Sequence, residues 1–71
     1  MAYSLAEVVQ QSGIPVDTIR YYQTIRLLPG PARDGRNAVY DDGHLDRLRL
    51  IRSMASRGFS LKVIAMLLEK G

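Results

Sequence analysis

Apolar residues recur at helical spacing in four separate stretches of the chain. In the first stretch, Leu5, Val8 and Val9 form one stripe, and Ser4 and Glu7 stand three positions apart around its start. A serine and a glutamate at this spacing cap the first turn of a helix reciprocally. We therefore expect a short helix that begins at Leu5.

The second apolar stretch predicts another helix directly after the first. Gly13 suits the tight turn between them, and Pro15 pre-sets the backbone for a first helical turn. Asp17 lies in that turn, where the helix dipole favours a carboxylate. Because Pro29 forbids continuation, we expect this helix to extend to Leu28.

The second helix is predicted to have one buried and one exposed face. Val16 and Ile19 fall on the side that packs against the rest of the chain. Arg20 and Tyr21 fall on the opposite side and should project outward. Tyr22 lies at the boundary, so we expect its ring to be half packed and its hydroxyl to reach water or a ligand.

A segment rich in glycine and proline follows and ends in Val39 and Tyr40, both of which favour strands. This pattern predicts a small hairpin with its tip between Asp34 and Asn37. Each arm is only two or three residues long. Tyr40 is expected to hold the hairpin against the core.

Two further amphipathic helices are predicted after the hairpin. Asp41 or Asp42 can cap the third helix, and Gly58 ends it. Ser60 can cap the fourth helix. The apolar residues at helical spacing are Leu45, Leu48, Ile51 and Ala55 in the third helix and Leu61, Ile64, Leu67 and Leu68 in the fourth.

The order of the elements predicts a mainly α fold, a winged helix-turn-helix. It has four helices and a small two-stranded wing between the second and third helices. The expected ranges are about 4–28 for the helix-turn-helix, about 29–40 for the wing, and about 42–57 and 60–70 for the last two helices. At 71 residues the chain forms one domain, near the lower limit for a single apolar core.

Composition narrows the possible functions. The chain has no cysteine, which excludes a disulfide scaffold and a thiolate metal site. No apolar run approaches the roughly 20 residues of a membrane span, and the N-terminus does not resemble a signal peptide, so we expect a cytoplasmic protein without a membrane partner. The net charge is +3, and lysine occurs only at Lys62 and Lys70. The excess of arginine favours a polyanionic partner.

Nothing in the sequence indicates an enzyme or a cofactor site. His44 is the only histidine, and it lacks the cysteine, second histidine or carboxylate pair that catalysis or metal binding would need. We expect it on the surface in the first turn of the third helix. Asp46 should pair with a nearby arginine. The arginines of this helix are expected to form a solvated face, and they are Arg47, Arg49, Arg52 and Arg57.

Three stretches together resemble the DNA-binding domain of the MerR transcription regulators. They read YSLAEVVQQSGIPVDTIRYYQ, LLPGPAR and VYDDGHLDRLRLIRSMASRGFSLKVIAMLL, and they cover nearly the whole chain. The family usually has Arg-Tyr-Tyr or Arg-Phe-Tyr on the second helix, an arginine entering the wing, a tyrosine closing it, and Gly-Phe-Ser-Leu after the third helix. The resemblance implies a sequence-specific regulator that binds promoter DNA, with the second helix in the major groove.

The resemblance also implies which residues contact DNA. Arg20 would reach base edges or phosphate, while Tyr21 and Tyr22 would touch phosphate or sugar. Arg33 would hold a phosphate from the wing, and the start of the fourth helix would add backbone contacts. The full set of expected DNA-binding residues is Asp17, Thr18, Arg20, Tyr21, Tyr22, Arg33, Arg36, Asn37, Ser60 and Lys62.

The sequence departs from the family pattern at three points. Arg26 stands where the family usually has a glycine, which leaves the turn conformation there open. The wing is one residue shorter, with Ala38 where an arginine is common, and we expect Arg36 to replace that arginine. Family members continue into a dimerisation helix and an effector domain, whereas this sequence stops at Gly71. We therefore favour a DNA-binding fragment over a naturally minimal protein, and we expect the full-length protein to be a homodimer.

Two other functions stay open on the sequence alone. An architectural DNA-bending factor of excisionase type has a similar winged fold, and it would bind direct repeats instead of an inverted repeat in a promoter. A protein-interaction module that docks RNA polymerase or a sigma factor would bind its partner with weak salt dependence and would tolerate Arg20→Ala.

Overall fold

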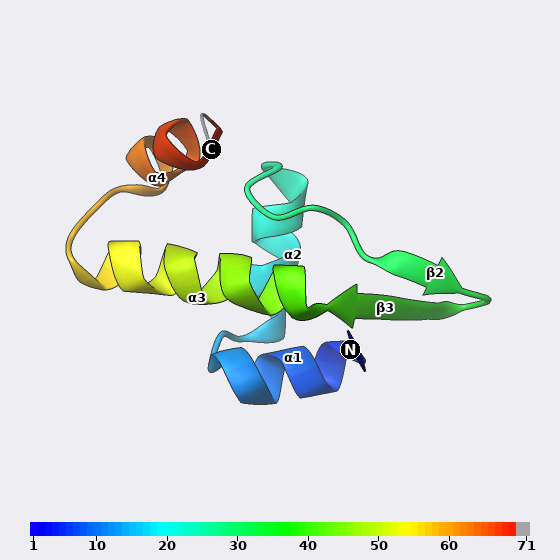
Figure 1. Cartoon of the computed structure of the whole chain (residues 1–71). Helices are drawn as coiled ribbons and strands as arrows, with labels where there is room; N and C mark the ends of the chain where they lie inside the picture. The colour runs from blue at the N-terminus through cyan, green and yellow to red at the C-terminus, as the bar shows by residue number, and fades with distance from the viewer. Residues whose placement is uncertain (70–71) are drawn as a thin grey trace.

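The structure, a computed structural model, describes residues 1–69. Four helices and three short strands follow one another along the chain (Figure 1). Their bounds are β1 (Ala2–Tyr3), α1 (Leu5–Ser12), α2 (Val16–Thr24), β2 (Ala32–Asp34), β3 (Asn37–Asp41), α3 (Asp42–Ser56) and α4 (Leu61–Glu69). The mainly α fold and the four predicted helices are confirmed.

The predicted capping box at the start of α1 is present. Glu7 donates its backbone N–H to the Ser4 hydroxyl at 3.1 Å, and Ser4 donates its backbone N–H to the Glu7 carboxylate at 2.9 Å. Gly13 ends the helix in the left-handed region, with φ +72°, and donates its N–H to Val9 at 2.9 Å. The local sequence therefore determines both ends of α1.

The prediction that the second helix extends to Leu28 was wrong. The helix ends at Thr24 because Arg26 adopts a left-handed conformation, with φ +63°. The N–H of Arg26 bonds to Gln23 O at 3.1 Å, and the N–H of Leu27 bonds to Tyr22 O at 2.8 Å. These two bonds form a Schellman motif, in which the left-handed position is usually glycine. The turn directs Leu27 and Leu28 into the core.

The wing is the hairpin of β2 and β3, and its predicted tip is confirmed. Asp34 pairs with Asn37, so Gly35 and Arg36 form a two-residue turn in which Gly35 has φ +61°. A glycine at the first position of such a turn suits the twist of the strands. The wing was expected to have two strands only. The structure adds β1 to the far side of β3, where Tyr3 pairs with Tyr40, and this gives an antiparallel sheet in the order β1-β3-β2.

The last two helices begin as predicted, each with a polar cap. Asp41 accepts the N–H of His44 at 3.1 Å at the start of α3, and Ser60 accepts the N–H of Val63 at 3.3 Å at the start of α4. After α3 the N–H of Phe59 bonds to Met54 O at 3.2 Å around Gly58, which has φ +94°. Position 70 of the range expected for the fourth helix lies outside the described residues.

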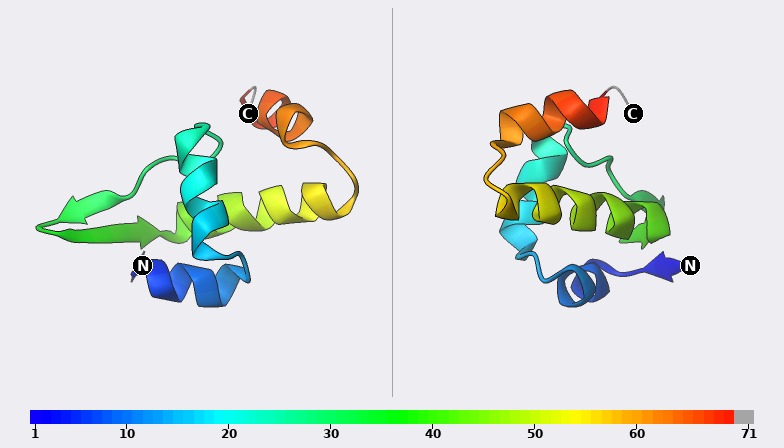
Figure 2. Two further views of the ribbon diagram at one scale, coloured as in Figure 1. Left: turned by 180° about the vertical axis from the view of Figure 1, so that it is seen from behind. Right: turned by 60° about the vertical axis from the view of Figure 1, so that its left-hand side comes forward.

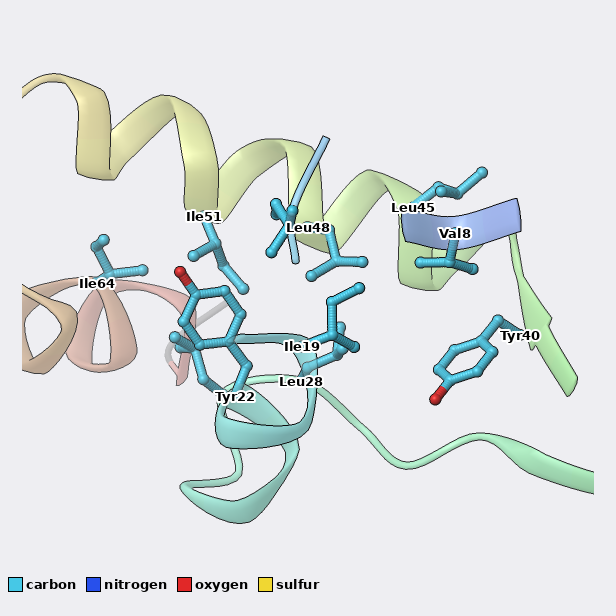
Figure 3. Packing of buried hydrophobic residues seen from close by; sticks show 11 residues of the cluster. Val8, Ile19, Tyr22, Leu28, Tyr40, Leu45, Leu48, Ile51 and Ile64 are labelled. Atoms are coloured by element: carbon cyan, nitrogen blue, oxygen red, sulfur yellow. The ribbon is translucent and has the colours of Figure 1, made fainter. Parts of the chain in front are cut away.

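The core lies where the inner face of α3 meets α1 and α2, and α4 contributes to it (Figures 1 and 3). Seen from behind, α2 crosses in front of α3 (Figure 2). The buried apolar residues are Val8, Ile14, Ile19, Tyr22, Leu27, Leu28, Tyr40, Leu45, Leu48, Ile51 and Ile64. Each of the four helices thus contributes at least one buried apolar side chain.

We predict that Arg26→Gly raises the free energy of unfolding by up to about 1 kcal/mol. A left-handed conformation costs a residue with a side chain about 1–2 kcal/mol, and the greater freedom of glycine in the unfolded chain offsets part of the gain. Urea denaturation followed by circular dichroism measures the difference.

Gly58→Ala is the matched control for this prediction. Gly58 occupies the same left-handed position after α3, and a Cβ there would meet no atom within 4 Å. Alanine should therefore destabilise by about 1 kcal/mol through backbone conformation alone. A loss of stability in Arg26→Gly would show that the left-handed arginine is not strained.

Candidate nucleic-acid interface

The outward face of α2 carries the predicted recognition residues. Arg20 and Asp17 are exposed, Tyr21 is 53% exposed, and Thr18 is half-buried. Ile19, on the opposite face, is fully buried in the core. Since burial of Ile19 fixes the rotation of the helix, Arg20 and Tyr21 must project outward, as the spacing predicted.

Tyr22 does not lie at the boundary, and the expectation of a half-packed ring was wrong. The side chain is only 8% exposed and belongs to the core (Figure 3). Tyr22 and Leu27 occupy the two positions at which a Schellman motif usually makes its apolar contact, and both are buried in the core. The rings of Tyr21 and Tyr22 lie 6.5 Å apart at a tilt of 48°. The buried ring of Tyr22 thus lies next to the exposed ring of Tyr21.

A side-chain hydrogen bond joins α2 to the base of the wing. Gln23 donates its amide N–H to the Tyr40 hydroxyl at 3.1 Å. Tyr40 is 2% exposed, so the prediction that it holds the wing against the core is confirmed. The bond links the base of the wing to α2.

The remaining predicted residues lie on either side of α2. Arg33, Arg36 and Asn37 are exposed on the wing, and Ser60 and Lys62 are exposed at the start of α4. In two opposite views α2 stands between the wing and the α3–α4 connection (Figures 1 and 2). The structure therefore presents three polar elements in series, with α2 in the middle.

Two of the α3 arginines are not simply a solvated face, which corrects that expectation. Arg52 donates Nη1–H to the Ser12 carbonyl at 2.7 Å, and Arg47 donates Nε–H to the Leu27 carbonyl at 3.0 Å. A Cβ at Gly13 would lie 2.3 Å from Arg52 Nη1. Ser12 is the last residue of α1 and Leu27 follows α2, so both bonds satisfy carbonyls at or just beyond a helix end and tie the helix-turn-helix unit to α3. Helical spacing alone carries no signal for them.

The other part of the arginine prediction is confirmed. Arg49 pairs with Asp46 at 3.9 Å, and both side chains are exposed. A pair this long and this exposed contributes little to stability.

His44 is buried, so the prediction of a surface histidine was wrong. It does lie in the first turn of α3, where its Nδ1 accepts the Asp41 backbone N–H at 3.1 Å. The same Nδ1 lies 3.0 Å from the Asp41 carboxylate, and Nε2 lies 3.2 Å from the Gly30 carbonyl. The ring also meets Tyr40 edge to face, with centroids 5.0 Å apart. The imidazole thus completes a capping box and connects three segments.

Carboxylates at the start of α3 have lowered pKa values. The His44 backbone N–H holds the pKa of Asp41 below its ordinary value, with the His44 side chain and the Gly43 N–H adding to the effect. The Tyr3 hydroxyl, which donates to Asp42 at 2.5 Å, and the N-terminal ammonium lower the pKa of Asp42. The same bond raises the pKa of Tyr3.

Two other kinds of feature are absent from the described residues. Residues 1–69 contain no group of three or more histidine, cysteine, aspartate or glutamate side chains placed to hold a metal ion. No helix in this part of the chain has the length and apolar character to cross a membrane. The exposed arginines and tyrosine remain the leading candidate site.

Comparison with known proteins identifies relatives over almost the whole chain. The family described as "MerR HTH family regulatory protein" matches residues 3–71. A mercuric resistance operon regulatory protein from Bacillus cereus is 35% identical over 69 residues, which are 96% of this chain and 52% of that protein.

Solved structures agree with the sequence relatives. HiNmlR, a MerR family regulator lacking the sensor domain and bound to promoter DNA, superposes with a TM-score of 0.87 at 34% identity, covering 97% of this chain and 53% of that one. The transcription regulator PbrR691 from Ralstonia metallidurans CH34, in complex with lead(II), gives 0.83 at 36% identity, covering 92% and 51%. The chain thus spans about half the length of these relatives.

We predict that Gly13→Ala destabilises the protein by about 1–3 kcal/mol and that Arg52→Ala reduces this loss. Alanine adds backbone strain at φ +72° and collides with the Arg52 guanidinium, and only the collision depends on residue 52. A double-mutant cycle by urea denaturation isolates the coupling. Purely additive losses would mean that the guanidinium moves aside freely.

A second prediction concerns stability in acid. The pKa of Asp41 is lowered in the folded protein from its ordinary value of 3.8. The ionised carboxylate therefore contributes to the free energy of unfolding above pH 3.8, and this contribution is lost as the pH falls through the lowered pKa. Asp41→Asn should therefore flatten the fall in stability below about pH 4. Thermal unfolding across a pH series measures this. Asp46→Asn, which removes a carboxylate that caps no helix, should leave the fall unchanged.

Proposed function

The chain belongs to the MerR family of helix-turn-helix regulatory proteins, and we propose that it binds promoter DNA sequence-specifically as a transcription regulator or as the DNA-binding domain of one. The observation that carries the proposal is the exposed Arg20 and Tyr21 face of α2, flanked by the wing and by the start of α4. A DNA-bound relative with a TM-score of 0.87 supports it.

In the proposed complex α2 enters the major groove. Arg20 donates to base edges or to phosphate, because a planar guanidinium can bond two acceptors of one guanine at once. Tyr21 touches phosphate or sugar. Asp17 and Thr18, in the first turn of α2, lie toward the end of the helix that enters a groove first in helix-turn-helix proteins. Tyr22 acts from the core, by holding this face in place.

The two flanking elements supply contacts that position the domain without reading sequence. Arg33 and Arg36 of the wing meet backbone phosphates on one side, and Asn37 adds a hydrogen bond. Ser60 and Lys62 meet the backbone on the other side. Contacts at both ends allow the protein to hold a deformed duplex, so part of the specificity can reside in base steps that no side chain touches.

We also propose that the full-length protein is a homodimer that binds an inverted repeat and acts on RNA polymerase. α4 exposes a row of apolar side chains that suits a protein contact, namely Val63 (39% exposed), Met66 (57%) and Leu67 (51%). A single domain should bind one half-site weakly, because a linked second copy raises the effective concentration at the second half-site.

We predict that Arg20→Ala and Arg33→Ala weaken DNA binding in different ways. Arg20→Ala should cost about 1–3 kcal/mol on a half-site and relax base preference, whereas Arg33→Ala should weaken all duplexes alike and reduce the salt slope by about one phosphate contact. Fluorescence-anisotropy titrations on a half-site selected by the wild type and on a scrambled duplex, across a salt series, measure both effects.

Arg49→Ala is the matched control, since it removes an exposed arginine from α3 outside the proposed interface. It should bind as the wild type does. Equal losses of DNA affinity in all three variants would show that binding depends only on general electrostatic attraction. Binding that persists in Arg20→Ala and barely depends on salt would instead favour a protein-interaction role.

A further inference from the structure

A surface hollow of about 620 Å³ lies between the connection after α2 and the start of α3. Its lining consists of Arg26, Pro29, Asp41, Gly43, His44 and Arg47. A second hollow of about 220 Å³ shares Arg26 and Arg47 and extends toward α4. The two arginines thus line both hollows.

Neither of these arginines has a carboxylate partner in the described part of the chain. The ion pairs within 4.0 Å among residues 1–69 join Met1 to Asp42, Asp41 to His44 and Asp46 to Arg49. Arg47 uses Nε–H for the Leu27 carbonyl, and no hydrogen bond in residues 1–69 engages its terminal nitrogens. The two guanidinium groups that line this hollow therefore have N–H donors that make no hydrogen bond or ion pair within residues 1–69.

The backbone at Arg26 provides a second, independent observation. Its left-handed conformation is the one that glycine adopts without strain, and the same motif after α3 does have a glycine, Gly58. Strained positions of this kind gather at functional sites. Glycine can form this turn without a side chain, so the turn does not explain why a charged arginine stands here. We therefore look for a function of the guanidinium group.

We propose that the hollow binds a small oxyanion, the phosphate or carboxylate group of a small molecule, between Arg26 and Arg47. The guanidinium fork matches both groups. Asp41 is the one carboxylate that lines this hollow, and its oxygens already accept the N–H groups of the first turn of α3. In this hollow the two arginines outnumber Asp41, so its carboxylate offsets only one of their two positive charges. Glu69 is exposed and lines the second hollow only.

This site is separate from the proposed DNA interface. None of the ten residues expected to contact DNA lines either hollow. The site nevertheless adjoins α2, since Arg26 follows that helix closely and Arg47 bonds to the carbonyl of the next residue. A bound oxyanion would therefore act on the end of the recognition helix and not on its exposed face.

The test is a titration of the ¹⁵N-labelled chain with inorganic phosphate, and separately with acetate, at constant ionic strength set by chloride. Saturable shifts of the Gly43 and His44 amides are expected in the wild type. Arg26→Gln, which keeps the length but not the charge, and Arg26→Gly, which suits the backbone, should each bind at least about tenfold more weakly. Arg49→Gln is the matched control and should titrate as the wild type does.

Shifts that grow linearly without saturation, or that are equal in the wild type and Arg26→Gln, would overturn the proposal. A further arm measures duplex binding in phosphate-free buffer. If Arg26→Gln lost about tenfold in duplex affinity while phosphate alone gave no saturable shift, the arginines would contact the DNA backbone and the small-molecule site would be rejected. The titration contains no DNA, so its outcome does not depend on the proposed promoter binding.

Discussion

The burial of one face of α3 is the constraint on which the rest of the structure depends. The two helices of the helix-turn-helix unit have eight and nine residues, too few for an isolated helix to be stable in water. Ile19 of α2 and Leu48 and Ile51 of α3 are all fully buried, so each short helix is held by what it packs against. The exposed face of α2 is therefore oriented by apolar contacts on the opposite side of the helix.

Hydrogen bonds from two α3 arginines add to these apolar contacts in holding α1 and α2 in place. Helix ends leave carbonyls without intrahelical partners, and the last residue of α1 and the chain after α2 each carry such a group into partly buried surroundings. Arg52 and Arg47 satisfy two of them across 40 and 20 residues of sequence. Because these bonds join the ends of α1 and α2 to one rigid helix, they help to fix the two short helices relative to each other.

Features encoded by neighbouring residues were predictable, and features that depend on distant contacts were not. The capping box of Ser4 and Glu7 and the glycine turns follow from local chemistry, and the exposure of Arg20 follows from helical spacing. The burial of His44 depends on a carbonyl 14 residues away, at Gly30. The pairing of β1 depends on β3, about 38 residues later. The DNA contacts proposed for the wing and α4 come from a family resemblance, because exposure alone does not distinguish a binding arginine from a solvated one.

Arg26 shows how a local rule can fail and still be informative. The proline at 29 and the leucines before it favoured a helix to Leu28, and no glycine suggested an earlier end. The fold nevertheless imposes the same left-handed turn after α2 as after α3, because Leu27 and Leu28, each 1% exposed, must reach the core. Tertiary burial thus overrides the backbone preference of arginine. The turn itself needs no side chain, so backbone geometry does not explain the charge of Arg26. That charge lies beside Arg47 in the lining of a surface hollow, which is where a role for it would be found.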